Sequence, residues 1–169
     1  MAGKLSNKTI AYSVYSNKIQ VPDTTEVELP EIEQLTDTIS GAGILGEIDL
    51  PTYGQIGSMT TTISFRASNK QTVEMLKNTD LEIRWVSDSI NTSNASAGTV
   101  ANKAFLKVKL KKFSEGKIAS GSAQDGSFEY EVLAYRRILD GAEIINIDKL
   151  NNVYKINGID QISDITKNL

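Results

Sequence analysis

The stretch from Glu26 to Ala67 constrains the fold of this 169-residue chain most, because it joins two strand patterns through a long glycine-rich arm. Apolar residues recur in its first part at Val27, Leu29, Ile32, Leu35 and Ile39. Its last part alternates, with Ile63, Phe65 and Ala67 on one face and Thr62, Ser64 and Arg66 on the other. A period of two predicts a half-buried antiparallel strand on this side of the arm.

The arm spans residues 40–57 and combines backbone freedom with apolar side chains. It contains five glycines and one proline. Its apolar side chains are Ile44, Leu45, Ile48, Leu50 and Tyr53. Hairpins usually close with far fewer residues, and a long loop usually has a function. Because an exposed apolar arm promotes aggregation of a monomer, we expect it to pack against a neighbouring molecule. Assembly is therefore the first hypothesis.

The composition excludes several kinds of functional site. The chain has no cysteine and no histidine, so it has no disulfide framework, no thiolate metal site and no histidine-dependent catalytic triad. A net charge of −3 argues against tight binding of nucleic acid by neutralisation of phosphates. The length and the ordinary share of hydrophobic residues predict one domain over residues 1–169.

The apolar runs are too short for a membrane protein. None approaches the roughly 18 residues that a membrane-spanning helix needs, and the N-terminal stretch lacks the apolar centre of a signal peptide. We therefore expect no direct insertion into a membrane, and synthesis in the cytoplasm.

The middle of the chain predicts one helix, one strand and one loop. Ser68 and Gln71 have the spacing of a capping box, which predicts a short helix that ends near Lys77 and buries Val73. Residues 81–85 alternate as a strand. Residues 88–102 are small and polar, which predicts a mobile surface loop.

The second half of the chain predicts a series of strands. Alternation is strong over residues 103–112, and a long strand follows over 128–139. Asp140-Gly141 predicts a tight hairpin turn into a strand over 142–148, and residues 153–156 continue the sheet.

The two ends of the chain carry weaker patterns. Asn157-Gly158 is expected to open a final helix whose apolar side includes Ile162 and Ile165. Residues 1–23 give a weak strand pattern, which suits either a frayed end or a strand that clasps a neighbour.

Two patterns that suggest chemistry have better structural explanations. Residues 41–46 match the G-x-G-x-x-G pattern of dinucleotide-binding proteins, but Pro51 follows too soon for the helix which that site requires. Glu129 and Glu131 share a strand face near lysines, which favours cross-strand charge pairing over acid–base catalysis. We therefore predict no catalytic residue, no cofactor and no metal site.

Two segments carry a family resemblance. VELPEIEQLTDTISGAGILGEIDLPTYG (27–54) and LDGAEIINIDKLNNVYKINGIDQISDI (139–165) resemble the major tail tube proteins of contractile-tailed phages and R-type bacteriocins. This family is related to the type VI secretion tube protein, and the order of the elements between the two segments matches as well. The resemblance implies a mainly β, antiparallel sandwich or barrel-like tail-tube fold with one short mid-chain helix and a C-terminal helix.

The same resemblance implies a structural protein rather than an enzyme. In this family six subunits form a ring, and the rings stack into a hollow tube inside a contractile sheath. The tube is the conduit for passage of DNA or for puncture of a membrane. The implied partners are further copies of the chain, the tail sheath protein, the baseplate and the tail terminator. The protein would then lie in a phage virion or in a tailocin particle, and the sequence suits both.

The resemblance also directs the assignment of residues. The expected contacts between subunits are Gly41, Gly43, Ile44, Leu45, Gly46, Ile48, Leu50, Pro51 and Tyr53. The candidates that face the lumen are Glu26, Glu28, Thr60, Thr62, Ser64 and Arg66. A hexamer of subunits with a charge of −3 would carry −18, so DNA should pass through the lumen without specific binding.

A different class of function remains open. Trp85 and the dispersed tyrosines also suit a β-sandwich module that binds carbohydrate or acts as an adhesin. Because Trp85 alternates with apolar neighbours, a role in the core is favoured.

Deletion of residues 42–50 tests the assignment of the arm. We expect a soluble monomer, because the deletion removes most of the apolar side chains that would contact a neighbour. Size-exclusion chromatography and electron microscopy measure the outcome, and rods formed by the deleted protein would contradict the assignment.

Overall fold

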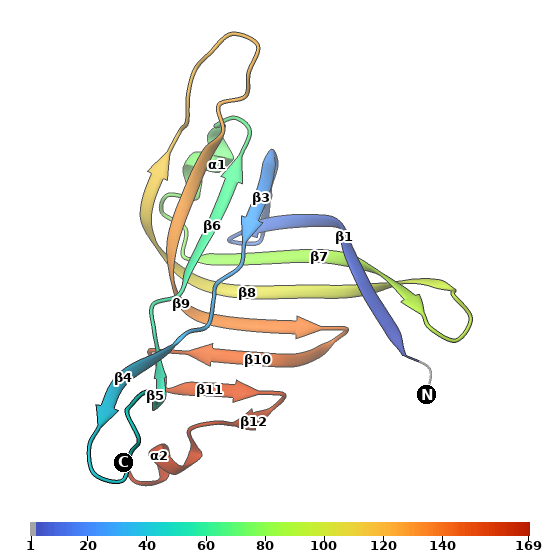
Figure 1. Ribbon diagram of the computed structural model, residues 1–169. Helices are drawn as coiled ribbons and strands as arrows, with labels where there is room; N and C mark the ends of the chain where they lie inside the picture. Colours follow the sequence, from blue (N-terminus) through green and yellow to red (C-terminus); the bar gives the residue numbers. More distant parts are fainter. Residues whose placement is uncertain (1–2) are drawn as a thin grey trace.

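A computed structural model describes residues 3–169, which form an antiparallel β protein with two short helices (Figure 1). The strands are β1 (Lys4–Ser16), β2 (Ile19–Val21), β3 (Thr24–Glu28), β4 (Gln34–Ser40), β5 (Glu47–Ile56), β6 (Thr60–Phe65), β7 (Asp80–Asn91), β8 (Ala97–Ser114), β9 (Gly126–Leu139), β10 (Ala142–Asp148), β11 (Val153–Ile156) and β12 (Ile159–Asp160). The helices are α1 (Lys70–Glu74) and α2 (Ser163–Lys167). The predicted mainly β fold, with one mid-chain and one terminal helix, is confirmed.

Two long strands, β8 and β9, pass from one layer of the structure into the other. The first part of β9 pairs with β6, and its last part pairs with β10. The register of β8 against β9 shifts between Lys107 and Val108, and again between Leu110 and Lys112. We call β3, β6 and the adjoining parts of β9 and β8 the short sheet. The long sheet has the order β12-β11-β10-β9-β8-β7-β1-β2.

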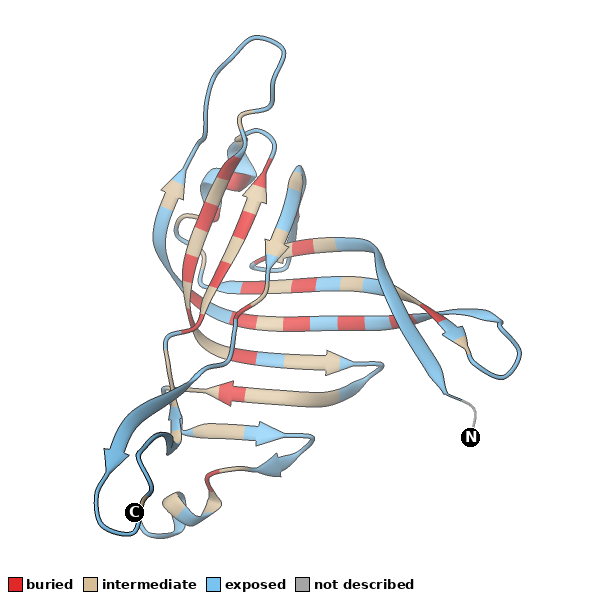
Figure 2. Ribbon diagram, viewed as in Figure 1, coloured by how far each residue is buried: buried red, intermediate tan, exposed pale blue. Residues whose placement is uncertain are grey.

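The core lies where the two sheets face each other (Figure 2). Ile63 and Phe65 of the short sheet are fully buried, whereas Thr62 and Ser64, which alternate with them, are only partly buried. The predicted alternation of this strand is thus confirmed up to Phe65. Ala67 is exposed, because β6 ends before it.

Helix α1 begins one residue later than the capping pattern predicts. The cap is Asn69, whose side chain accepts from the Thr72 backbone N–H at 2.9 Å while the Thr72 hydroxyl accepts from the Asn69 N–H at 2.7 Å. The Ser68 N–H instead donates to the side chain of Gln124. The helix buries Thr72 and leaves Val73 exposed, so the predicted burial of Val73 was wrong.

The loop predicted over residues 88–102 is also wrong. Strands β7 and β8 run through most of this segment and pair from Asp88–Thr99 to Ile90–Ala97, with a turn between them. The strands continue here because each satisfies the backbone hydrogen bonds of its partner. This pairing outweighs the low strand propensity of the small side chains. Strand β1 pairs with β7 from Lys4 onward, so this part of the N-terminal segment is an ordered strand and is not frayed.

Two dipeptides with positive φ angles form the turns of the C-terminal part. Asp140 and Gly141, with φ of 48° and 81°, form the predicted hairpin turn between β9 and β10. Asn157 and Gly158 have φ of 51° and 78° and join β11 to β12. Because an α-helix requires negative φ, this pair cannot open a helix as predicted, and α2 is only Ser163–Lys167.

The arm is a separate two-stranded hairpin of β4 and β5 that points away from both sheets (Figure 1). The continuous strand predicted before the arm is therefore divided, since β3 pairs with β6 and β4 pairs with β5. Residues 47–56 form a strand within the segment expected to be a loop. The glycines at 41, 43 and 46 have φ of 135°, 88° and 90° at the tip, and no helix follows them.

The base of the arm rests against α2. The hydroxyl of Tyr53 donates to the Gln161 carbonyl at 2.9 Å. A Cβ atom at Gly54 would lie 2.7 Å from Ile165 Cδ1 and 3.0 Å from Ile162 Cγ2, so a larger residue would have to displace these side chains of the C-terminal segment. The C-terminal helix therefore fixes the base of the arm.

Substitution Gly54→Ala tests this packing. We expect a loss of about 1–3 kcal/mol in the free energy of unfolding, because the new methyl group overpacks the contact at a positive φ. Urea unfolding gives the loss, and hydrogen exchange should show faster exchange in α2.

The matched control is Gly43→Ala, which has a similar φ of +88° but open space around the added methyl group. It should cost about 1 kcal/mol and leave exchange in α2 unchanged. Equal effects of the two substitutions on α2 would contradict the packing.

Candidate assembly surfaces

The arm exposes nearly all of its side chains (Figure 2). Every residue of β4 is exposed, and Leu45 at the tip is exposed completely. Ile48, Leu50 and Tyr53 are each about half exposed, at 45%, 51% and 58%. The structure thus brings the predicted contact residues together on one projection: Gly41, Gly43, Ile44, Leu45 and Gly46 at the tip, and Ile48, Leu50, Pro51 and Tyr53 on β5.

The register of the arm gives it two different faces. Asp37 pairs with Leu50 and Ile39 pairs with Ile48, so these four side chains share one face. We call this the apolar arm face, and Leu35 belongs to it by alternation along β4. The opposite face carries Pro51 and is otherwise polar, with Thr36, Thr38, Ser40, Glu47 and Asp49, and the Thr38 hydroxyl donates to Asp49 at 2.5 Å.

Five of the six lumen candidates lie on the outward face of the short sheet. Glu28 pairs with Thr62, Glu26 pairs with Ser64, and Thr60 lies on the same side of β6. Arg66 is not part of this row, because it follows the end of β6, where its N–H donates to the Asp23 carbonyl.

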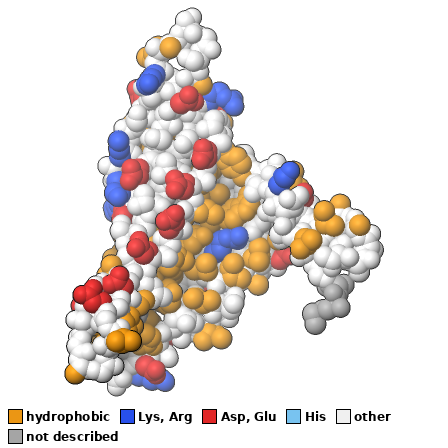
Figure 3. Space-filling model, viewed as in Figure 1, with side chains coloured by type: hydrophobic (Ala, Val, Ile, Leu, Met, Phe, Trp, Pro, Cys, Tyr) orange, Lys and Arg blue, Asp and Glu red, His pale blue; other side chains and the backbone are white. Residues whose placement is uncertain are grey.

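Strand β9 adds two carboxylates to the same face that the lumen assignment missed. Glu129 pairs with Thr62, and Glu131 pairs with Thr60. Lys111 Nζ lies 3.6 Å from Glu129 and 3.8 Å from Glu131, which confirms the predicted cross-strand charge pairing. Figure 3 shows acidic side chains in a line along this ridge of the molecule. The face is polar and carries four glutamates, and Lys109, Lys111 and Lys112 of β8 lie beside two of them.

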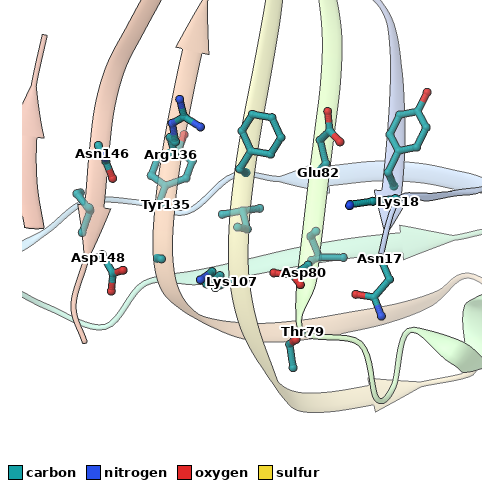
Figure 4. Close-up of a pocket in the computed structure, with 16 residues that line it drawn as sticks. Asn17, Lys18, Thr79, Asp80, Glu82, Lys107, Tyr135, Arg136, Asn146 and Asp148 are labelled. Atoms are coloured by element: carbon teal, nitrogen blue, oxygen red, sulfur yellow. The ribbon is translucent and has the colours of Figure 1, made fainter. Parts of the chain in front are cut away.

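The outward face of the long sheet has a hollow of about 720 Å³ (Figure 4). Glu82 of β7 and Arg136 of β9, on the two strands that flank β8, point to the same side, and each has a partner of opposite charge. The Arg136 guanidinium lies 2.7 Å from Glu143, and this hydrogen bond lowers the pKa of Glu143. Glu82 and Arg136 are thus paired within the subunit.

Trp85 does not form an exposed platform for a sugar ring. It packs partly buried against the core, and the Arg137 guanidinium lies 4.3 Å from the centre of its ring. Carbohydrate binding would require an exposed face of this ring, and the Arg137 guanidinium covers one face. The predicted role of Trp85 in packing is therefore favoured.

Neither a cluster of metal ligands nor a membrane-spanning helix occurs in the part of the chain that the structure describes. Residues 3–169 contain no group of three or more metal-ligating side chains. The helices among these residues are too short and too polar to cross a membrane.

The family of the chain follows from comparison with known proteins. The family model described as phage tail tube protein FII matches residues 7–169. A comparison with curated proteins gave no match. The family match covers both segments that carry the sequence resemblance, the arm and the sheets, and it agrees with the antiparallel fold and the exposed projection. The chain belongs to the phage tail tube protein FII family, whose members are structural tail proteins.

Proposed function

We propose that this protein is the subunit of the inner tube of a contractile tail, in which hexameric rings stack into a hollow conduit. The observation that carries the proposal is the arm, most of whose apolar side chains are half or fully exposed in the described subunit. A structural tail protein with such a projection requires another molecule to bury it.

The short sheet supports closure into a ring. Strand β3 pairs only with β6, and the end of β8 pairs only with β9, so both borders of this sheet have free backbone groups. Six copies joined edge to edge at these borders would supply four strands each, more than the roughly 16–18 strands that give porins a small pore. Such closure also removes the exposed edges.

The acidic face of the short sheet would then line the lumen. Glu26, Glu28, Thr60, Thr62 and Ser64 are the proposed lumen residues from the sequence, and Glu129 joins them through the register of β9. Arg66 would lie at the rim of this face. Because acidic residues repel phosphates, duplex DNA would slide through without specific binding.

The arm would hold neighbouring rings or subunits together. Its proposed contacts are the tip and β5, from Gly41 to Tyr53. Further proposed partners are the tail sheath protein, the baseplate and the tail terminator. The particle would be a phage tail or a tailocin that punctures a membrane, assembled from protein made in the bacterial cytoplasm.

Negative-stain microscopy of the purified full-length protein tests the proposal. We expect hollow rods or rings, since apolar arms and open sheet borders drive association. A monodisperse monomer at high concentration would contradict it and would favour a soluble binding module instead.

The charge of the lumen is tested by the double substitution Glu28→Lys and Glu129→Lys. Tubes assembled from this variant with short duplex DNA should retain DNA that resists nuclease, because lysines in the lumen neutralise phosphates. Retention should fall as the salt concentration rises.

The matched control is Glu115→Lys with Asp164→Lys, which changes the net charge equally at exposed positions outside the short sheet. Its tubes should retain no more nuclease-resistant DNA than the wild type. Equal retention by both variants would contradict the lumen assignment.

A further inference from the structure

The inward face of the long sheet extends beyond the area that the short sheet covers. Leu81 and Leu106 are buried in the core, and Ile83, Ala104 and Asn102 of the next rows are buried as well, but the residues at the ends of these rows are exposed. Leu139 and Tyr12 are 36% and 37% exposed on this face. Figure 3 shows a hydrophobic recess between the acidic ridge and the opposite lobe, with a basic patch inside it. We define the recess by Tyr12, Val27, Ile83 and Trp85, with Arg137 and Leu139 beside them in the register of β9. Glu26 lies at its β3 edge and has no ion pair with Arg137.

Arg137 is the one basic residue among these six, and the subunit supplies no carboxylate for it. Its guanidinium stacks on Trp85 and donates to Asn102 Oδ1 at 2.6 Å and to the Ile138 carbonyl at 2.7 Å. Both acceptors are neutral, and no ion pair within residues 3–169 includes Arg137. A guanidinium has five N–H donors, so this half-buried cation has donors left for an incoming carboxylate.

The apolar arm face has the complementary composition. Its side chains are Leu35, Asp37, Ile39, Ile48 and Leu50, which are four apolar residues around one carboxylate. Asp37 has no hydrogen-bond or ion-pair partner through its side chain within the described subunit. Residues 19–65, which include the arm, contain eight of the 21 acidic residues and none of the 18 basic ones.

We infer that the apolar arm face of one copy docks into the recess of another copy, where Asp37 binds the Arg137 guanidinium of that second copy. The inference rests on the proposed tube function, because it names the partner surface of the arm. The occupant is a second copy because Tyr53 and Gly54 tie the base of each arm to α2 of its own subunit, and the arm points away from both sheets (Figure 1).

This contact explains how an assembly could extend. The arm and the recess are different surfaces of one molecule, so each subunit donates its arm to one neighbour and accepts an arm from another. Such head-to-tail contacts close into rings or continue along a rod. The charge pair fixes the position of the arm in the recess, since any other register leaves a desolvated charge without a partner.

The first test compares Asp37→Asn with Glu47→Gln, which removes one charge on the opposite, polar face of the arm. Asp37→Asn should raise the protein concentration needed for assembly roughly 30-fold or more, because truncation of one member of a buried charge pair typically costs that much in affinity. Glu47→Gln should leave it within a few-fold of the wild type. Light scattering measures both, and equal effects would overturn the inference.

The second test uses the absence of cysteine from the chain. Asp37→Cys protein is mixed with Leu139→Cys protein, assembled and oxidised, and disulfide-linked dimers are measured on a non-reducing gel. Glu47→Cys replaces Asp37→Cys in the control. Strong cross-linking from position 37 and weak cross-linking from position 47 supports the contact.

The outcomes separate the inference from the function on which it rests. Wild-type rods together with no cross-link from position 37, or with equal cross-links from both positions, would overturn the Asp37–Arg137 contact and leave the tube function standing. A wild type that forms neither rings nor rods would overturn both.

Discussion

The pairing of β8 with β9 is the interaction on which the rest of the structure depends, because these two strands belong to both sheets. Each strand bends as it passes from the long sheet into the short sheet, and the register shifts near Val108 and Lys112 accompany the bend. The bend turns the apolar rows of the two sheets toward each other and buries Phe65, Phe128 and Tyr130 between them. The same geometry turns the acidic side of the short sheet outward, where the row of glutamates forms.

The bend also limits what one subunit can cover. The short sheet is narrower than the long sheet, so it buries the row of Leu81 and Leu106 and leaves the recess around Trp85 and Arg137 open. The arm cannot cover this recess in its own subunit, because contacts with α2 fix its base in another direction. One chain therefore has both an uncovered apolar recess and an unburied apolar hairpin. Association of identical copies would bury both surfaces.

Local patterns predicted the elements that depend on near neighbours. The alternation around Ile63 identified the half-buried strand β6, and Asp140-Gly141 identified the turn between β9 and β10, because side-chain period and positive φ are properties of a few consecutive residues. Residues 88–102 were misjudged because partner strands distant in sequence, and not local propensity, hold that segment extended. The grouping of the lumen candidates was expected, whereas the partner-free Arg137 was not, since its surroundings depend on register across three strands.

The central claim is that the arm and the recess gain their partners only when copies associate. Hydrogen exchange followed by mass spectrometry tests this most directly, on dilute monomer and on assembled particles of the same protein. The account predicts that amides of β4 and β5 exchange quickly in the monomer and slowly in the particles, with slower exchange also in β7 near Trp85. Protection of the arm that is already complete in the monomer, or an arm that still exchanges freely in the particles, would contradict it.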